Sequence, residues 1–377
     1  MTDTNDLIYR SRVRGCLLGG AIGDALGAPV EFWDRSSIVR TCGEDGVTEF
    51  LPDMVGVDEV YGRVTDDTQM TLFTAEGMIR ASVRCDRGLG FTVAVVQHAY
   101  DRWLDTQLEE GPDGTRDGWL INQQWLYSQR APGQTCLSAL ISARQGERSI
   151  QRFGQPAHND SMGCGGVMRS APFGLTPPGW AQSLEWQFDA AAEAASYTHG
   201  HPTGQLASGA QAALIAAIVA GQCLPDAVAS MLAVLEGHEH HEETTAAIRR
   251  ALAAAEAGEP GADVVESLGG GWVAHETLAI ALYAALVHPG PEGIAEALTL
   301  SVSHSGDSDS TGAVCGNILG ALYGDEALPP ELAFEIEGRG TILELADDFI
   351  YEFTQSRRLH GDHFEGRNRW TTRYPGW

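Results

Sequence analysis

Apolar residues recur at the spacing of a helix face through most of this 377-residue sequence, whereas the alternation typical of strands is nearly absent. Alanine and glycine are abundant and long runs of Val, Ile and Thr are scarce, which favours helices packed closely through small residues. We therefore predict an all-α fold. The expected helices cover residues 12–27, 67–82, 90–108, 186–198, 204–221, 226–236, 242–257, 274–288, 292–302, 309–323 and 341–355.

Stretches rich in Gly, Pro and Asp separate these helices and are expected to be connecting loops. They cover residues 41–62, 109–118, 154–166 and 257–272. None resembles a long flexible linker, so we expect residues 1–377 to form a single domain. Irregular excursions are expected in 41–62 and 109–130.

Two segments carry a glycine at every fourth residue: Gly15, Gly19, Gly23 and Gly27 in one, and Gly312, Gly316 and Gly320 in the other. A glycine inside a helix costs up to about 1 kcal/mol relative to alanine, so each stripe needs a compensating gain, which close backbone packing can supply. Two interpretations stay open. Each stripe permits some tight helix crossing, or the two helices pack on each other.

The charge balance indicates which partners are disfavoured. There are 51 acidic and 24 basic residues, giving a formal charge of -27, which repels phosphate backbones and anionic lipids. Non-specific nucleic-acid binding and membrane binding are therefore not expected, although a modified nucleic acid stays open as a substrate. Seven cysteines without a C-x-x-C pair, and an N-terminus without an apolar leader, predict reduced thiols and a cytoplasmic protein.

Two similar acidic clusters, about 240 residues apart, each lead into an apolar helix. The first is Thr65-Asp66-Asp67-Thr68; the second contains Asp307, Asp309, Ser310 and Thr311. Acidic and hydroxyl residues favour helix N-termini, so the clusters can be two independent caps. Alternatively they form one oxygen-lined site. Carboxylates gathered there would repel by about 4 kcal/mol per pair at 4 Å, so such a site requires cations.

The oxygen-only ligand set selects a hard divalent ion over zinc. We expect magnesium, with manganese as the alternative, and two ions would suit hydrolysis by orienting a water and holding substrate oxygens. Calcium fits poorly, because neither cluster has the 12-residue loop pattern with a distal glutamate.

Six motifs in order along nearly the whole chain resemble the ADP-ribosylglycohydrolase family, also called the dinitrogenase-reductase-activating glycohydrolase family. They are GCLLGGAIGDALGAPVE, TDDTQM, HNDSMGCGGVMRSAPFG, SYTHGHP, GWVAHETLAIAL and SGDSDSTGAVCGNILGALYG. The resemblance implies an all-helical orthogonal bundle with a dinuclear magnesium centre at the base of an ADP-ribose cleft. It also implies hydrolysis of the bond between ADP-ribose and a modified acceptor.

The resemblance assigns roles to individual residues. Glu31 would correspond to a mobile glutamate near the metals, with a solvent-exposed helix end as the alternative, and Asp24 in the same motif is expected to form a structural ion pair. The implied metal ligands are Thr65, Asp66, Asp67, Asp307, Asp309 and Ser310. The implied ADP-ribose contacts are Asn159, Ser161, Met162, Gly163, Cys164, Gly165 and His199.

The sequence departs from the family pattern at Ser310, where Thr is common, at Cys164-Gly165, where a second Asn-Gly is common, and at His275-Glu276, where a Glu pair is common. Ser310 keeps the ligand oxygen, whereas Cys164 removes a polar group beside the substrate. The cluster His238, His240 and His241 is expected to be a solvated helix start rather than a metal site.

The expected mechanism is attack of a metal-held water on the anomeric carbon, with Asp67 or Asp307 assisting proton transfer and Glu31 nearby. A dinuclear phosphohydrolase and a non-catalytic ADP-ribose-binding protein are the alternatives. The sequence leaves the acceptor open: arginine, serine, a nucleobase and a small metabolite all fit. A role in toxin immunity and one in endogenous regulation are equally open.

Overall fold

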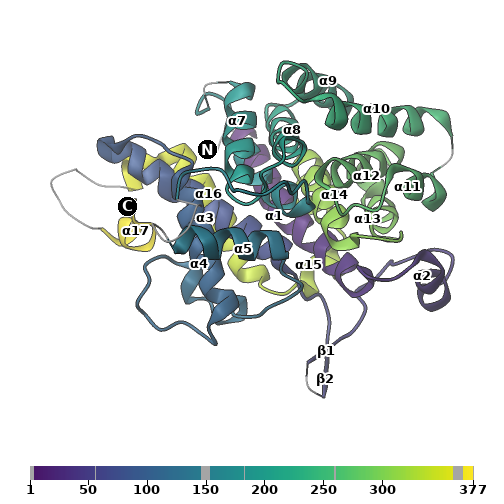
Figure 1. Cartoon of the computed structure of the whole chain (residues 1–377), viewed down its shortest axis with the longest axis horizontal. Helices are drawn as coiled ribbons and strands as arrows, with labels where there is room; N and C mark the ends of the chain where they lie inside the picture. The colour runs from purple at the N-terminus through teal and green to yellow at the C-terminus, as the bar shows by residue number, and fades with distance from the viewer. Residues whose placement is uncertain are drawn as a thin grey trace.

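Helices account for nearly all the regular structure of the computed structural model, which describes residues 4–55, 57–145, 153–181, 183–258, 260–359 and 368–376 (Figure 1). This confirms the all-α class; the single-domain boundary stays a prediction. The α-helices are α1 (Thr4–Gly27), α2 (Arg35–Cys42), α3 (Asp66–Arg84), α4 (Ala94–Leu108), α5 (Gln134–Arg144), α6 (Ala171–Gly174), α7 (Leu184–Ser196), α8 (Pro202–Val219), α9 (Leu224–Leu235), α10 (Glu242–Ala257), α11 (Ala262–Leu268), α12 (Ala274–Val287), α13 (Ile294–Val302), α14 (Ser308–Tyr323), α15 (Pro330–Glu335), α16 (Arg339–Leu359) and α17 (Arg369–Arg373).

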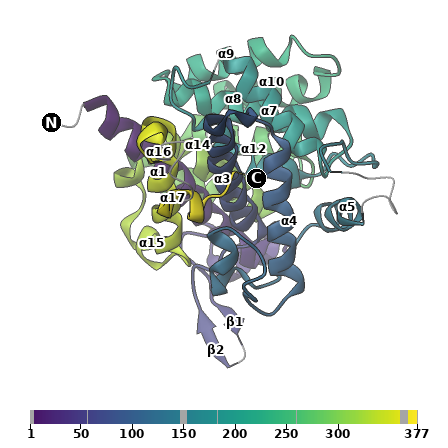
Figure 2. The same cartoon turned by 90° about the vertical axis from the view of Figure 1, so that its left-hand side faces the viewer.

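A short β-hairpin interrupts the helices where an irregular excursion was predicted. β1 (Asp53–Val55) pairs antiparallel with β2 (Asp58–Val60), and Asp53 lies opposite Val60. The hairpin projects away from the helices in both views (Figures 1 and 2). No helix in the described part of the chain is long and apolar enough to cross a membrane.

The predicted helices are all present, but α1 begins at Thr4 rather than at residue 12, and the short helices α2, α5, α6, α15 and α17 were not predicted. Two further corrections have a local cause. The helix expected over 90–108 begins only at Ala94, because Gly88 and Gly90 adopt positive φ angles of 78° and 77° and the chain leaves the helix there. The loop expected over 257–272 contains α11, which buries Val265 and Leu268; seven residues are too few to show helical periodicity.

The two glycine stripes pack directly on each other, so the second interpretation of them is confirmed. A Cβ atom built on Gly19 would lie 2.5 Å from the carbonyl oxygen of Gly316, and one on Gly23 would lie 1.9 Å from that of Gly312. The pairing is antiparallel, and α1 and α14 lie side by side in both views (Figures 1 and 2). The C-terminal end of α1 therefore meets the N-terminal end of α14.

Substituting Gly316 by alanine is expected to lower the free energy of unfolding by at least about 2 kcal/mol, because the new methyl group would lie 1.9 Å from the backbone oxygen of Gly19. The matched control is Gly340→Ala in α16, where nothing lies within 4 Å of the added carbon. That variant should gain up to about 1 kcal/mol. Chemical denaturation of both proteins measures the difference, and equal stabilities would contradict the packing.

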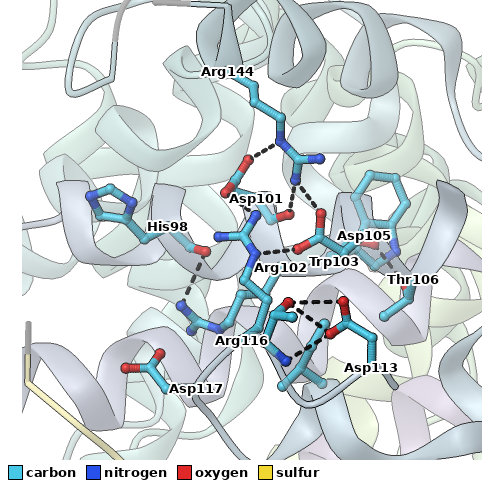
Figure 3. A network of polar contacts seen from close by, with 12 residues as sticks. His98, Asp101, Arg102, Trp103, Asp105, Thr106, Asp113, Arg116, Asp117 and Arg144 are labelled. Carbon is cyan, nitrogen blue, oxygen red and sulfur yellow. Dashed lines mark hydrogen bonds and ion pairs between the residues drawn. The ribbon is translucent and has the colours of Figure 1, made fainter. Parts of the chain in front are cut away.

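An ion-pair network built on two buried aspartates fastens α5 and the loop before it to α4 (Figure 3). Asp101 and Asp105 on α4 each pair with both Arg116 and Arg144, at N···O distances of 2.6–2.8 Å. Each carboxylate thus meets two guanidinium groups, which compensates its burial. The network fixes α5, whose first residues lie beside the acidic turn of α3.

Candidate metal centre and its flanking loops

Acidic residues from both ends of the chain converge where α1 ends and α14 begins. Glu31 ends a short 3-10 turn (Ala28–Val30) that follows α1, and Asp307 and Asp309 open α14. These three residues are buried, and each offers an oxygen atom within 4.8 Å of the others. The antiparallel glycine contact explains the meeting, because it places the end of the GDALGAPVE segment against the SGDSDS turn.

Asp66 and Asp67 lie in the first turn of α3, close enough to this group for their charges to interact. The side chain of Thr65 caps the helix by accepting from the backbone N–H of Asp67 at 3.3 Å. Burial, followed by the charge of Asp309, raises the pKa of Asp66 and of Asp67. The same two causes raise the pKa of Glu31 to about 9.

The two acidic residues at the start of α14 are also buried and also have raised pKa values. Asp307 is 2% and Asp309 3% exposed, and burial is the main cause that raises the pKa of both. Asp307 caps α14 by accepting from the N–H of Ser310 at 3.3 Å, and Asp309 accepts from the same N–H at 2.9 Å. Ser310 is also buried, next in the chain to Asp309.

Two observations indicate that these residues are suited to bind a divalent cation. No ion pair among the described residues includes any of the five carboxylates of Glu31, Asp66, Asp67, Asp307 and Asp309, although burying an unpaired charge is costly. The Oδ2 atom of Asp67 is buried and has no hydrogen-bond partner in the described part of the chain. An all-oxygen set of this kind suits a hard ion such as magnesium or manganese.

Asp24 does not form the ion pair expected from the sequence. It is fully buried, and its carboxylate accepts hydrogen bonds from the backbone N–H groups of Thr65 and Thr68 and from the Thr68 hydroxyl. The prediction was wrong because the N-terminal N–H groups of α3, rather than an arginine, stabilise the buried carboxylate.

Three backbone hydrogen bonds connect the glycine-rich loop, residues 159–166, to the acidic cluster through the 270–274 turn. The N–H of Cys164 donates to the carbonyl of Trp272 at 3.2 Å, and the N–H of Ala274 donates to that of Met162 at 2.9 Å. The N–H of Asp307 in turn donates to the carbonyl of Gly270 at 2.8 Å. The predicted substrate loop, the 270–274 turn and the start of α14 therefore form one continuous wall.

Most of the predicted substrate contacts gather on this wall. His199 lies next to Gly163 and Gly165, and burial beside Arg169 lowers its pKa to about 3, so its ring is neutral. Ser161 accepts from the N–H of Gly163 at 3.3 Å. Asn159 supports the loop: its side chain accepts from the N–H groups of Ser161 and Gly200 and donates to the carbonyl of Thr198. Their contacts with ADP-ribose stay predictions.

Cys164 touches the acidic cluster directly. Its thiol donates to Oδ2 of Asp307 at 2.7 Å. Burial, followed by the charge of Asp307, raises the pKa of this thiol, so it stays protonated at neutral pH. The residue that departs from the family pattern therefore links the predicted substrate loop to the acidic cluster.

Because the thiolate is the nucleophile, Cys164 is expected to react with iodoacetamide at pH 8 at least about tenfold more slowly than the exposed Cys85 and Cys223. Peptide mass spectrometry after timed alkylation measures the three rates. Equal labelling of all three would mean that the contact with Asp307 is absent in solution.

A family model described as ADP-ribosylglycohydrolase matches residues 5–359. The chain belongs to the ADP-ribosylglycohydrolase family. Its relatives include an uncharacterized protein of Archaeoglobus fulgidus, 30% identical over 90% of this chain and 96% of that protein. The uncharacterized protein YegU of Escherichia coli is 26% identical over 86% and 92%.

Relatives whose names state an activity are less similar in sequence. The ADP-ribosylarginine hydrolase Tri1 of Pseudomonas putida is 24% identical, covering 90% of this chain and 78% of its own length. A solved ADP-ribosylglycohydrolase-related protein complex has a TM-score of 0.63 at 23% identity, covering 92% of this chain and 99% of its own, and shows the shared fold.

Sequence reasoning missed two features of this ADP-ribosylglycohydrolase site. Phe32 and Trp272 stack beside the centre, with ring centroids 5.7 Å apart, and both are exposed. Gly133, just before α5, donates its N–H to Asp66 at 3.4 Å. Trp272 belongs to the motif GWVAHETLAIAL and follows a run of glycines, so its exposure in a turn could have been predicted from the sequence. No local pattern indicates the contact between Gly133 and Asp66.

The histidine cluster before α10 fits the expected helix start. His238 stacks on Phe188 at a centroid distance of 4.3 Å, and His241 is the residue before the first turn of α10. In the described ranges, only Glu31, Asp307 and Asp309 form a group of three His, Cys, Asp or Glu side chains whose ligand atoms all lie within 4.8 Å of one another.

Proposed function

We propose that this chain is a magnesium-dependent hydrolase that cleaves the glycosidic bond between ADP-ribose and a modified acceptor, with manganese as an alternative ion. One observation carries the proposal: five buried carboxylates from both ends of the chain converge without a basic partner among the described residues. Membership of the family and two relatives named for removing ADP-ribose, from Pseudomonas putida and Rhodospirillum rubrum, support the substrate class.

The residues that would hold the ions are Thr65, Asp66, Asp67, Asp307, Asp309 and Ser310, with Glu31 alongside them. Two divalent cations bound there would lower the pKa of a water and offset most, but not all, of the negative charge of the five carboxylates. The buried Oδ2 atom of Asp67, which has no hydrogen-bond partner among the described residues, would accept the proton of the attacking water, with Asp307 as the other candidate base.

The surrounding carboxylates also suit the transition state. Breaking a glycosidic bond develops positive charge at the anomeric carbon and the ring oxygen. Negative groups fixed in a site that excludes water stabilise such a charge without having to reorganise. Glu31 directly precedes Phe32, which is exposed, so we propose that the acceptor binds beside Phe32. We propose that the ADP-ribose binds along the wall formed by the glycine-rich loop and His199.

The test is a panel of ADP-ribosylated substrates carrying arginine, serine, a nucleobase or a small metabolite as the acceptor, each incubated with magnesium, manganese or EDTA. Mass spectrometry should detect free ADP-ribose with at least one substrate, and EDTA should prevent its release. Phosphate release from a simple ester without free ADP-ribose would indicate a phosphohydrolase instead. Binding of ADP-ribose in calorimetry, without turnover of any substrate, would indicate a non-catalytic binding protein.

A further inference from the structure

Asp24 is a buried carboxylate beside the acidic cluster, and both of its oxygens accept hydrogen bonds from the first turn of α3. Its Oδ2 atom accepts from the N–H of Thr65 at 2.9 Å, the N–H of Thr68 at 3.1 Å and the hydroxyl of Thr68 at 2.5 Å. Its Oδ1 atom also accepts from the N–H of Thr65, at 3.1 Å. An oxygen that already accepts three hydrogen bonds is a poor metal ligand, so Asp24 has another task.

That task is to cap α3 from a different helix. The first N–H groups of a helix have no partner within it, and an acidic side chain in the first turn commonly supplies one. Here Asp24 of α1 receives the N–H groups of Thr65 and Thr68, while Thr65 receives that of Asp67. Asp67 is therefore not needed as a cap, and its Oδ2 atom stays without a partner in the described residues.

The position of Asp24 depends on the glycine stripe around it. Gly23 lies against the carbonyl of Gly312, and Gly27 lies against that of Ser308, so neither has room for a side chain. The backbone of α1 is thus pressed against the first turns of α14, and Asp24 reaches from there to the first turn of α3. One carboxylate joins the two chain segments that carry the acidic turns.

We propose that Asp24 is a positioning residue of the metal centre, which holds the Thr65-Asp66-Asp67 turn at the separation from Asp307 and Asp309 at which both turns bind the same cations. The inference rests on the proposed function, and adds to it a residue that touches neither metal nor substrate. Its partner in this task is Thr68, whose hydroxyl is the closest donor to Asp24.

The experiment measures cation affinity directly, by calorimetric titration of the full-length protein with manganese and with magnesium. Asp24→Asn is expected to weaken binding by about 10- to 100-fold, the usual effect of removing a residue that orients metal ligands. Thr68→Val, which keeps the backbone bonds but loses the hydroxyl, should weaken binding by about 3- to 10-fold, and Thr68→Ser should restore it. In turnover assays, a higher magnesium concentration should recover much of the lost rate.

Glu76 provides the matched control for a general effect on stability. It is a fully buried carboxylate on α3 that accepts from the N–H groups of Trp119 and Leu120 and pairs with Arg102. It lies ten residues further along the helix, roughly 15 Å from Asp66. Glu76→Gln should lower the melting temperature of the EDTA-treated protein while leaving the cation affinity within about twofold of the wild type.

The measured cation affinities distinguish failure of the positioning role of Asp24 from failure of the proposed function. Wild-type affinity in both Asp24→Asn and Thr68→Val would overturn the positioning role and leave the metal centre intact. If Asp24→Asn does not fold, the comparison of Thr68→Val with Thr68→Ser decides, and equal affinities overturn the inference. A wild-type protein that binds neither cation would overturn the proposed function together with it.

Discussion

Replacing Asp307 by alanine is expected to reduce the release of ADP-ribose by at least about a hundredfold with every substrate of the panel. The reason is electrostatic. Asp307 is 2% exposed, lies in the group formed with Glu31 and Asp309, and has no basic partner in the described ranges. Removing one preorganised group that faces developing charge commonly costs about 10²- to 10³-fold in rate. The loss should appear in kcat as well as in kcat/KM, measured from released ADP-ribose.

Two variants control for the other task of Asp307, which caps α14. Asp307→Asn keeps an oxygen that can accept from the N–H of Ser310, so it should fold normally and still lose activity. Ser183→Ala removes the comparable cap of α7, where the serine accepts from the N–H of Trp186, at a cost of about 1 kcal/mol. That variant should keep full activity. Retained activity in both Asp307 variants would mean that the metal centre has been misplaced.

Most of the long helices could be predicted from the sequence because local periodicity encodes them, whereas α2, α5 and α15 are short and were not predicted. The stripe beginning at Gly15 and the stripe ending at Gly320 showed that two helices are closely packed. The stripes alone did not indicate the partner of either, because a glycine specifies a close approach and not what approaches. Only the structure shows that they pack on each other in an antiparallel direction, and that this contact brings Glu31 to Asp307.

The limit of sequence reasoning is clearest at Asp24. A buried aspartate in a glycine-rich helix is commonly paired with a basic residue, and the sequence offers no sign that the partners are N–H groups about 41 residues away. Hydrogen bonds between a side chain and a distant backbone leave no local pattern. The same is true of the contact between Gly133 and Asp66, and of the thiol that Cys164 directs at Asp307. Motifs therefore predicted candidate ligands, but not the groups that contact and orient them.

Removing divalent ions is expected to make the stability of the protein depend strongly on pH. Burial raises the pKa of Asp24 to about 7 and that of Glu31 to about 9, from ordinary values near 4, and also raises those of Asp66, Asp67, Asp307 and Asp309. Between the ordinary and the raised pKa, the folded protein binds more protons than the unfolded chain. The free energy of unfolding therefore falls as pH rises through this window.

In EDTA, the melting temperature should consequently drop by roughly 5 °C or more between pH 5.5 and pH 8.5. Magnesium should reverse the drop, and its effect should be larger at pH 8.5, because a ligand carboxylate must lose its proton to bind the ion. Differential scanning fluorimetry at several pH values, with EDTA and with magnesium, measures both effects. Asp309→Asn removes the charge that interacts with Glu31, Asp66 and Asp67, so it should flatten the EDTA profile and abolish the response to magnesium. Identical profiles for this variant and the wild type would show that the carboxylates do not share one site.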